Sequence, residues 1–317
     1  IVPVLPSLSD DLSFQTLIFS AYFFGAMTTT LPAGVASDRY GQPLLIRISL
    51  VLTLISGILI ITLTEPVDLL IWRFIEGIGA GFFVSSALSW IGYQKDTLKN
   101  TSLFMASLNF GLLSGLIGSG WLAMVTGDIL LGTLVCTLGT GLICIMVCII
   151  TIPRLGAQDR ISAQVLVRET GSQMLRQYPL WFSVIILLGS TGYVQAVFPE
   201  LSGYPVHEVS TVLAAMNFAT IIASLGTPYL KIEPVLLIRI SALMIVPLLF
   251  SFLIAPVIIL IMGAVAGLIM VSQIGYLAHA EERQGIAMGL YSTCSYAGMT
   301  LLPAIGGFII SYSSFET

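Results

Sequence analysis

Charged residues are scarce in this sequence of 317 residues, of which 9% are Asp, Glu, Lys or Arg. Soluble domains carry roughly 25%. Hydrophobic residues make up 56% of the chain, and the mean hydropathy is +1.00. A water-soluble core of this size could not bury so much apolar surface, so we expect the chain to lie in a lipid bilayer.

Residues for metal or catalytic chemistry are also few. All four cysteines lie in apolar runs; Cys144 and Cys148 share a helical face without a nearby His or carboxylate, so we interpret them as packing residues. No G-x-x-x-x-G-K-[ST] motif is present, so we expect no ATP-driven step within this chain. No cluster of His, Asp or Ser suggests an enzyme. The sequence predicts no cofactor, no metal site and no nucleic-acid partner.

Apolar segments follow one another along the chain, each near the roughly 20 residues needed to cross hydrocarbon. They span 14–36, 43–63, 66–91, 101–123, 129–152, 179–198, 208–226, 234–253, 255–278 and 285–312. The polar stretch 153–178 is predicted to be a linker, partly helical along the membrane surface. The sequence thus predicts an all-α polytopic membrane protein with an N-terminal half (1–152), this linker and a C-terminal half (179–317).

The charges outside these segments separate by side. One set of loops holds Arg39, Arg47, Lys95, Lys99, Arg154, Arg160, Arg168, Arg176, Lys231, Arg239 and Arg283. The opposite set holds Asp10, Asp11, Glu65, Asp68, Asp128, Glu200, Glu208 and Glu316. Cytoplasmic loops of membrane proteins carry the excess of Lys and Arg. We therefore expect the protein to lie in the cell membrane, with the linker on the cytoplasmic face and both chain ends on the outer face.

An internal repeat relates the two halves. The stretch Leu-Leu-Ile-Arg-Ile-Ser occurs at 44–49 and again at 236–241. In nearly the same register, further pairs are Gly34 with Gly226, Arg39 with Lys231, Gly77 and Gly81 with Gly263 and Gly267, and Gly111 and Gly120 with Gly298 and Gly307. Several matches at nearly constant offset predict a duplicated, two-half transporter. The G-x-x-x-G spacings are typical of closely packed helices.

The turn between the first two segments carries Gly34, Asp38, Arg39 and Gly41, in the pattern G-x-x-x-D-R-x-G. This pattern resembles the cytoplasmic loop between the second and third helices of the major facilitator superfamily. The resemblance implies that Asp38 latches the cytoplasmic side against a neighbouring helix end. Members have two six-helix halves with both ends cytoplasmic, so we expect most of a first helix and all of a twelfth to be absent here.

Within the segments, clear charge occurs at Arg73 and Glu76, which share a helix face and can pair. One interpretation is a neutralised structural pair; the other is that Glu76 gains and loses a proton during transport, modulated by Arg73. The run from Arg73 to Gly81 resembles the fourth-helix motif of the family, R-x-x-Q-G-x-G, which implies substrate or proton handling by Arg73.

Small residues and proline mark further packing or hinge positions. The stretch containing Gly111, Gly115 and Gly120 resembles the fifth-helix pattern of proton-coupled exporters, and Pro303 keeps the proline of that pattern in the second half. A packing seam is the alternative interpretation. Polar residues within segments are the candidates for a solute cavity: Tyr22, Asn109, Tyr193, Gln195, Asn217, Gln273, Tyr291 and Tyr296. Analogy with the family favours Tyr193, Gln195 and Gln273.

These observations predict a monomeric secondary transporter whose partners are the lipid bilayer, a small solute and protons. Proton-coupled export of hydrophobic compounds is the first hypothesis. The alternatives are proton-linked uptake of a nutrient or of an organic anion attracted to Arg73, and a non-transporting receptor or scaffold.

Overall fold

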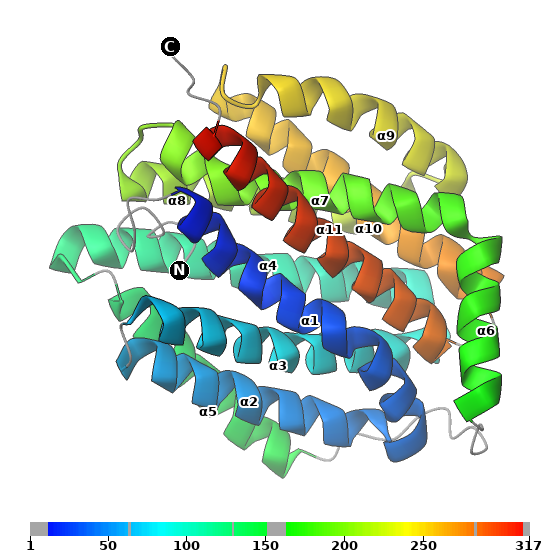
Figure 1. The fold of residues 1–317 in the computed structure, drawn as a ribbon. Coiled ribbons are helices and arrows are strands. Elements are labelled where there is room, and N and C mark those ends of the chain that lie inside the picture. Colours follow the sequence, from blue (N-terminus) through cyan, green and yellow to red (C-terminus); the bar gives the residue numbers. More distant parts are fainter. Residues whose placement is uncertain (1–11, 63–64, 129, 151–162, 282–283, 313–317) are drawn as a thin grey trace.

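The computed structural model describes residues 12–62, 65–128, 130–150, 163–281 and 284–312 (Figure 1). Within these ranges the chain is helical and contains no β-strand, as predicted. The helices are α1 (Leu12–Tyr40), α2 (Gln42–Thr62), α3 (Pro66–Gly92), α4 (Thr97–Thr126), α5 (Leu131–Ile149), α6 (Ala163–Arg176), α7 (Tyr178–Leu201), α8 (Val206–Gly226), the short 3-10 helix η2 (Thr227–Tyr229), α9 (Pro234–Ser251), α10 (Pro256–Ala280) and α11 (Gln284–Tyr312).

Nine of the helices in the described ranges are long and apolar enough to cross a membrane. The predicted segment 66–91 corresponds to α3, which is not among the nine. With 27 residues α3 is longer than α2 (21 residues) and shorter than α4 (30 residues), and it carries Asp68, Arg73 and Glu76. It packs against α1 and α2 within the same bundle.

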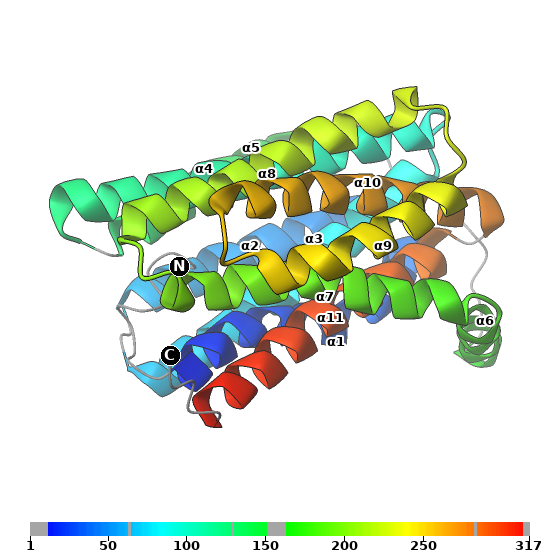
Figure 2. The same ribbon diagram turned by 90° about the horizontal axis from the view of Figure 1, so that it is seen from above.

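The long helices lie side by side, and α6 lies across one end of the bundle (Figures 1 and 2). We call this the α6 end and the other the far end, where α1 begins and α11 ends. The N-terminal helices α1–α5 meet the C-terminal helices α7–α11 mainly through two pairs, α1 with α11 and α4 with α8. Thr30 Oγ1 and Thr293 Oγ1, 2.7 Å apart, bridge the first pair, and Ser20 Oγ donates to Thr300 O at 3.1 Å.

The turn between α1 and α2 is tighter than predicted. The expected loop from Gly34 onward is helical as far as Tyr40, and the break occurs at Gly41, whose φ of 97° favours glycine. The helix continues because Gly34 and Ser37 are buried; a Cβ added at Gly34 would lie 2.6 Å from Gly285 O of α11. The side chains of Asp38 and Arg39 lie outside the described residues, so the latch stays a prediction.

Four of the predicted packing glycines lie at close helix crossings. A Cβ added at Gly77 of α3 would lie 1.9 Å from Tyr22 O of α1, and one at Gly81 would lie 2.8 Å from Ala26 O. The repeat-related positions on α10 meet α8 in the same way. An added Cβ would lie 2.1 Å from Met216 O at Gly263 and 2.5 Å from Thr220 O at Gly267. Backbones therefore touch at equivalent places in both sets of helices.

Other predicted packing positions differ from one another. Gly120 faces α8, where an added Cβ would lie 1.7 Å from Ser210 Oγ. Gly111 has no neighbour within 4 Å of such an atom, and Gly115 has only Cys136 Sγ at 3.9 Å. These two glycines therefore border open space rather than a tight seam, which corrects the packing prediction for them. Pro303 is buried inside α11, which continues to Tyr312.

The α6 helix is tied to the bundle by a buried carboxylate. Glu281, 5% exposed, follows α10 and accepts hydrogen bonds from Arg176 Nη2 at the end of α6, with a distance of 2.6 Å to Oε1. Nearby, Trp181 Nε1 donates to Gln173 O at 3.2 Å, and Tyr276 Oη donates to Gln177 Oε1 at 3.2 Å. The helical part of the predicted linker is thus held against α7 and α10; residues 151–162 lie outside the described ranges.

The glycine crossings lead to a first prediction. Gly77→Val places a side chain where Tyr22 O lies, so it should destabilise the fold by about 1 to 3 kcal/mol. The midpoint of thermal unfolding in detergent measures this. Gly139→Val on α5 is the matched control, because an added Cβ there meets nothing within 4 Å. Equal midpoints for the two variants would contradict the assignment of a tight α1–α3 crossing.

A second prediction concerns the Arg176–Glu281 contact. Arg176→Gln removes the cation from a buried carboxylate, and because the Arg176 side chain is 59% exposed, solvent screening limits the loss to about 1 kcal/mol. Trypsin should then cleave within α6 faster than in the unsubstituted protein. Arg168→Gln, an exposed position on the same helix, should leave the cleavage rate at Arg176, the other tryptic site of α6, unchanged. A cleavage rate unaffected by Arg176→Gln would show that the contact does not hold α6.

Candidate functional site

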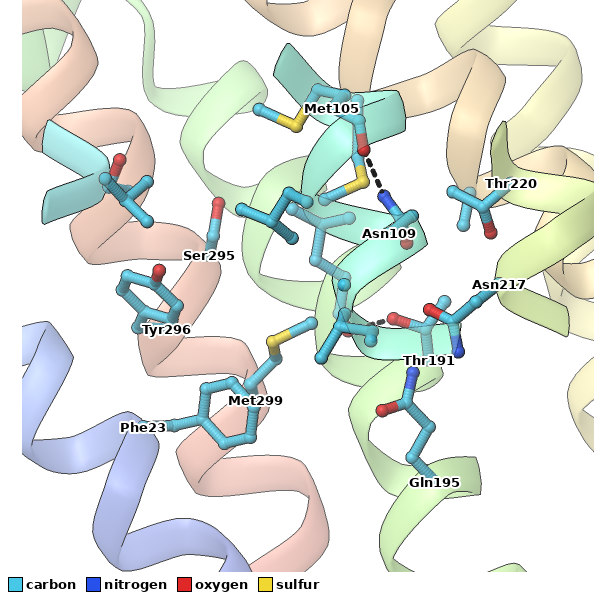
Figure 3. Close-up of a pocket in the computed structure, with 18 of the residues that line it drawn as sticks. Phe23, Met105, Asn109, Thr191, Gln195, Asn217, Thr220, Ser295, Tyr296 and Met299 are labelled. Carbon is cyan, nitrogen blue, oxygen red and sulfur yellow. Dashed lines mark hydrogen bonds between the residues drawn. The ribbon is translucent and has the colours of Figure 1, made fainter. Parts of the chain in front are cut away.

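A central cavity of about 520 Å³ lies between the N-terminal and C-terminal helices (Figure 3). Its walls come from α1, α3, α4 and α5 on one side of the sequence and from α7, α8, α10 and α11 on the other. None of the described residues that line it is Asp, Glu, Lys, Arg or His. The cavity is therefore uncharged, and any polarity comes from amides, hydroxyls and aromatic rings.

Carboxamides and hydroxyls gather on the wall formed by α4, α7 and α8, where Asn109, Thr191, Gln195, Asn217 and Thr220 lie near one another (Figure 3). Their positions are fixed because most of them hydrogen-bond to the backbone of their own helix. Asn109 Nδ2 donates to Met105 O and Asn217 Nδ2 to Leu213 O, both at 2.8 Å.

The α1 and α11 wall is aromatic. Phe23 packs edge-on against Tyr22, with 5.0 Å between ring centroids, and lies 5.9 Å from the ring of Tyr296. Met299 lies beside them (Figure 3), and Met105, Met216 and Met270 also reach the lining. Flexible thioethers and flat rings can adapt to an apolar solute of varied shape.

A second cavity of about 270 Å³ adjoins the first, since Tyr22, Phe23, Gly111, Leu112 and Gln195 line both. This side cavity contains the predicted charge pair. Arg73 forms an ion pair with Glu76, and its guanidinium carbon lies 4.7 Å from the ring centroid of Tyr22. Arg73 Nε is buried and makes no hydrogen bond to any described residue, so its N–H is available to donate to a bound solute.

Apolar clusters bound the central cavity toward both ends. The α6-end cluster joins residues of both helix sets, among them Val84, Leu88, Met105, Trp181, Leu277 and Ile286. The far-end cluster joins Ile18, Phe19 and Leu69 to Ala196 and Val197 of α7. Because each cluster contains residues from both sets, a change in the angle between the sets would open one cluster and preserve the other.

Six of the eight predicted cavity residues line the central cavity: Tyr22, Asn109, Gln195, Asn217, Tyr291 and Tyr296. Tyr193 and Gln273 do not. Tyr193 packs edge-on against Phe252 with ring centroids 6.2 Å apart, and fully buried Gln273 donates from Nε2 to Ser183 Oγ at 3.1 Å. Contact of any of these residues with a solute stays a prediction.

Sequence reasoning missed Thr191, Thr220, Ser292 and Ser295 in the lining. On α11 a signal was present: Ser292, Ser295, Tyr296 and Met299 recur at spacings of three and four and so share one helix face. Reading that face as a unit would have found both serines.

The family model of the Major Facilitator Superfamily matches residues 1–303. The chain belongs to this superfamily. No curated protein matches it by sequence.

Solved structures of transporters share the superfamily fold. The human organic anion transporter MFSD10 (TETRAN) is 11% identical, with a TM-score of 0.73 over 93% of this chain and 77% of that one. A variant of the nucleoside transporter NupG is 13% identical, with a TM-score of 0.72 over 98% and 85%. A variant of the E. coli fucose:proton symporter FucP is 15% identical, with a TM-score of 0.67 over 97% and 88%. At these identities the likeness shows the fold alone. The chain is thus an integral membrane protein with the fold of this superfamily, and its family points to transport rather than to enzymatic catalysis.

Proposed function

We propose that this superfamily member is a secondary active transporter that moves a small amphipathic solute through the central cavity by alternating access. The observation that carries the proposal is an uncharged, aromatic-lined cavity between two helix sets, bounded toward each end by an apolar cluster that both sets share. A receptor or scaffold would need no such pair of end clusters. Rocking one set against the other would expose the cavity to each side in turn.

Coupling to protons is assigned to the Arg73–Glu76 pair. Charged groups inside a membrane protein are costly unless paired, and as an ion pair these two are neutral together. Protonation of Glu76 would release Arg73, leaving a net positive charge beside the cavity; loss of the proton would restore the pair. Because the side cavity adjoins the central one, binding of the solute could change the affinity of Glu76 for the proton, and protonation could change the affinity for the solute.

Export of hydrophobic compounds is the direction we favour, because the lining is apolar, aromatic and uncharged. The second candidate is proton-linked uptake of a nutrient or of an organic anion attracted to Arg73, whose Nε retains a free donor. Measuring whether cells that contain the protein lose or accumulate a labelled solute separates the two.

The membrane orientation follows from the cations. Apart from Arg73, the Lys and Arg side chains that the structure describes belong to α6-end segments: Arg47, Lys95, Lys99, Arg168, Arg176, Lys231 and Arg239. We therefore infer that α6 faces the cytoplasm. A cell membrane as the location and a monomer as the acting form stay predictions.

Alternating access predicts that a covalent link between the helix sets stops transport. Thr30→Cys with Thr293→Cys, in a background without the four native cysteines, places two thiols where hydroxyls lie 2.7 Å apart. Oxidation should abolish solute flux in proteoliposomes, and a reductant should restore it.

Gly57→Cys with Thr137→Cys is the matched control, because it links α2 to α5 within one set; a Cβ added at Gly57 would lie 3.3 Å from Thr137 Cβ. Its oxidation should leave flux intact. Undiminished flux through the fully oxidised Thr30–Thr293 pair would refute motion between the sets.

Proton coupling predicts a specific defect for Glu76→Gln. The variant cannot exchange a proton at this position, so an imposed pH gradient should no longer drive solute accumulation, while solute exchange at equal pH continues. Asp68→Asn, on the same helix but outside both cavities, should retain gradient-driven accumulation. Accumulation by Glu76→Gln equal to that of the unsubstituted protein would remove Glu76 from the coupling step.

A further inference from the structure

Several hydrogen-bond donors on the polar wall of the central cavity are committed to the protein backbone. Asn109 and Asn217 each donate an amide N–H to the carbonyl four residues earlier, at 2.8 Å. A carbonyl can only accept, so Nδ2 must point to the backbone, which leaves Oδ1 and the second N–H of each amide. Neither Oδ1 accepts a hydrogen bond from a described residue, and both residues line the cavity. Each therefore offers the solute a fixed acceptor.

The hydroxyls of this lining behave in the same way. Thr191 Oγ1 donates to Leu188 O at 2.7 Å, Thr220 Oγ1 donates to Gly263 O at 2.9 Å, and Ser295 Oγ donates to Tyr291 O at 2.8 Å. A hydroxyl has one proton and two lone pairs, so with the proton committed each presents lone pairs to the cavity. The α4, α7 and α8 wall and Ser295 of α11 thus offer several acceptors.

The aromatic rings of the lining also favour a solute that carries N–H donors or a positive charge. The faces of Tyr22, Phe23, Phe83 and Tyr296 carry partial negative charge, which attracts N–H donors and cations. Ser292 Oγ, in a residue 2% exposed, lines the cavity without a hydrogen-bond partner among the described residues. It is a buried polar atom that a bound solute would satisfy.

An anionic solute would find little to neutralise it here. No described cation lines the central cavity, and Arg73 in the side cavity is paired with Glu76. A carboxylate would meet carbonyl oxygens, lone pairs and ring faces that repel negative charge, and the donors that remain, among them Ser292 Oγ and Tyr291 Oη, carry no charge to neutralise it. A primary amine instead supplies up to three donors to the acceptors and, when protonated, a cation to the rings.

We propose that the central cavity selects amphipathic primary amines, with Asn109 and Asn217 as the acceptors that determine specificity. This rests on the proposed function, because it names the solute class of the same cavity. The N–H donors, rather than the positive charge alone, carry the selection.

The test is binding to the full chain in nanodiscs, measured by isothermal titration calorimetry with empty nanodiscs subtracted. Three probes share one skeleton: 2-(2-naphthyl)ethylamine, its N,N,N-trimethyl derivative, which is cationic but has no N–H, and 2-naphthylacetate, an anion. The primary amine should bind about tenfold more tightly than the trimethyl derivative. The anion should bind most weakly. Tighter binding of the anion, or equal binding of the two cations, would overturn the proposal.

Substitutions test whether Asn109 and Asn217 determine the preference for primary amines. Asn109→Leu and Asn217→Leu should each weaken amine binding about tenfold and leave the trimethyl derivative unaffected. Asn100→Leu is the matched control on α4; its amide donates to Gln94 Oε1 at 2.9 Å, outside the cavity, and its loss should not change amine binding. Asn109→Asp and Asn217→Asp keep an acceptor and should retain amine binding, which separates loss of the acceptor from loss of the fold. Amine binding unchanged in both Leu variants would contradict the assignment.

The proposed solute class and the proposed transport mechanism can be refuted independently by these experiments. Selective amine binding together with flux that persists through the oxidised Thr30–Thr293 link would refute alternating access and support the cavity assignment. The converse, a link that stops flux and a cavity that prefers the anion, would refute only the solute class.

Discussion

Polar groups inside hydrocarbon must find their hydrogen-bond partners within the protein, and this constraint shapes both the fold and the cavity. Most described Ser and Thr hydroxyls that donate a hydrogen bond donate it to a backbone carbonyl; Ser85, for example, donates to Gly81 O at 2.5 Å on its own helix. The cavity amides obey the same rule. As a consequence, Asn109 and Asn217 each commit one donor to the backbone and keep an acceptor, which gives the cavity a hydrogen-bonding character that its residue types alone do not specify.

Close backbone contact provides the packing that the hydrophobic effect cannot provide between helices in lipid. Glycines at Gly77 and Gly81 let α3 approach α1, and Gly263 and Gly267 let α10 approach α8. These crossings fix the helices within each set. Between the sets, close glycine contacts such as Gly34 against Gly285 O are joined by apolar clusters at both ends and by threonine or serine bridges. We propose that these contacts separate at one end while persisting at the other.

The helical segments could be predicted from the sequence because bilayer thickness dictates their length. The two-half architecture could be predicted because the stretches at 44–49 and 236–241 are identical. Local turn geometry was less accessible: the pattern around Gly34 suggested a loop, but burial of that residue against α11 keeps the chain helical until Gly41. Which way a side chain points was hardest. On helices apolar all round, one residue step turns the direction by about 100°, so Tyr193 and Gln273 were indistinguishable from Gln195, which does line the cavity.

Motion between the helix sets is most directly tested by distances at both ends of the bundle, measured by pulsed electron paramagnetic resonance on spin-label pairs. One pair, at Lys95 and Lys231, reports on the α6 end; the other, at Asp128 and Glu208, reports on the far end, and all four positions are exposed. Adding the solute or changing the pH should shorten one distance distribution and lengthen the other. Two distributions that stay fixed, or that change in the same direction, would contradict alternating access.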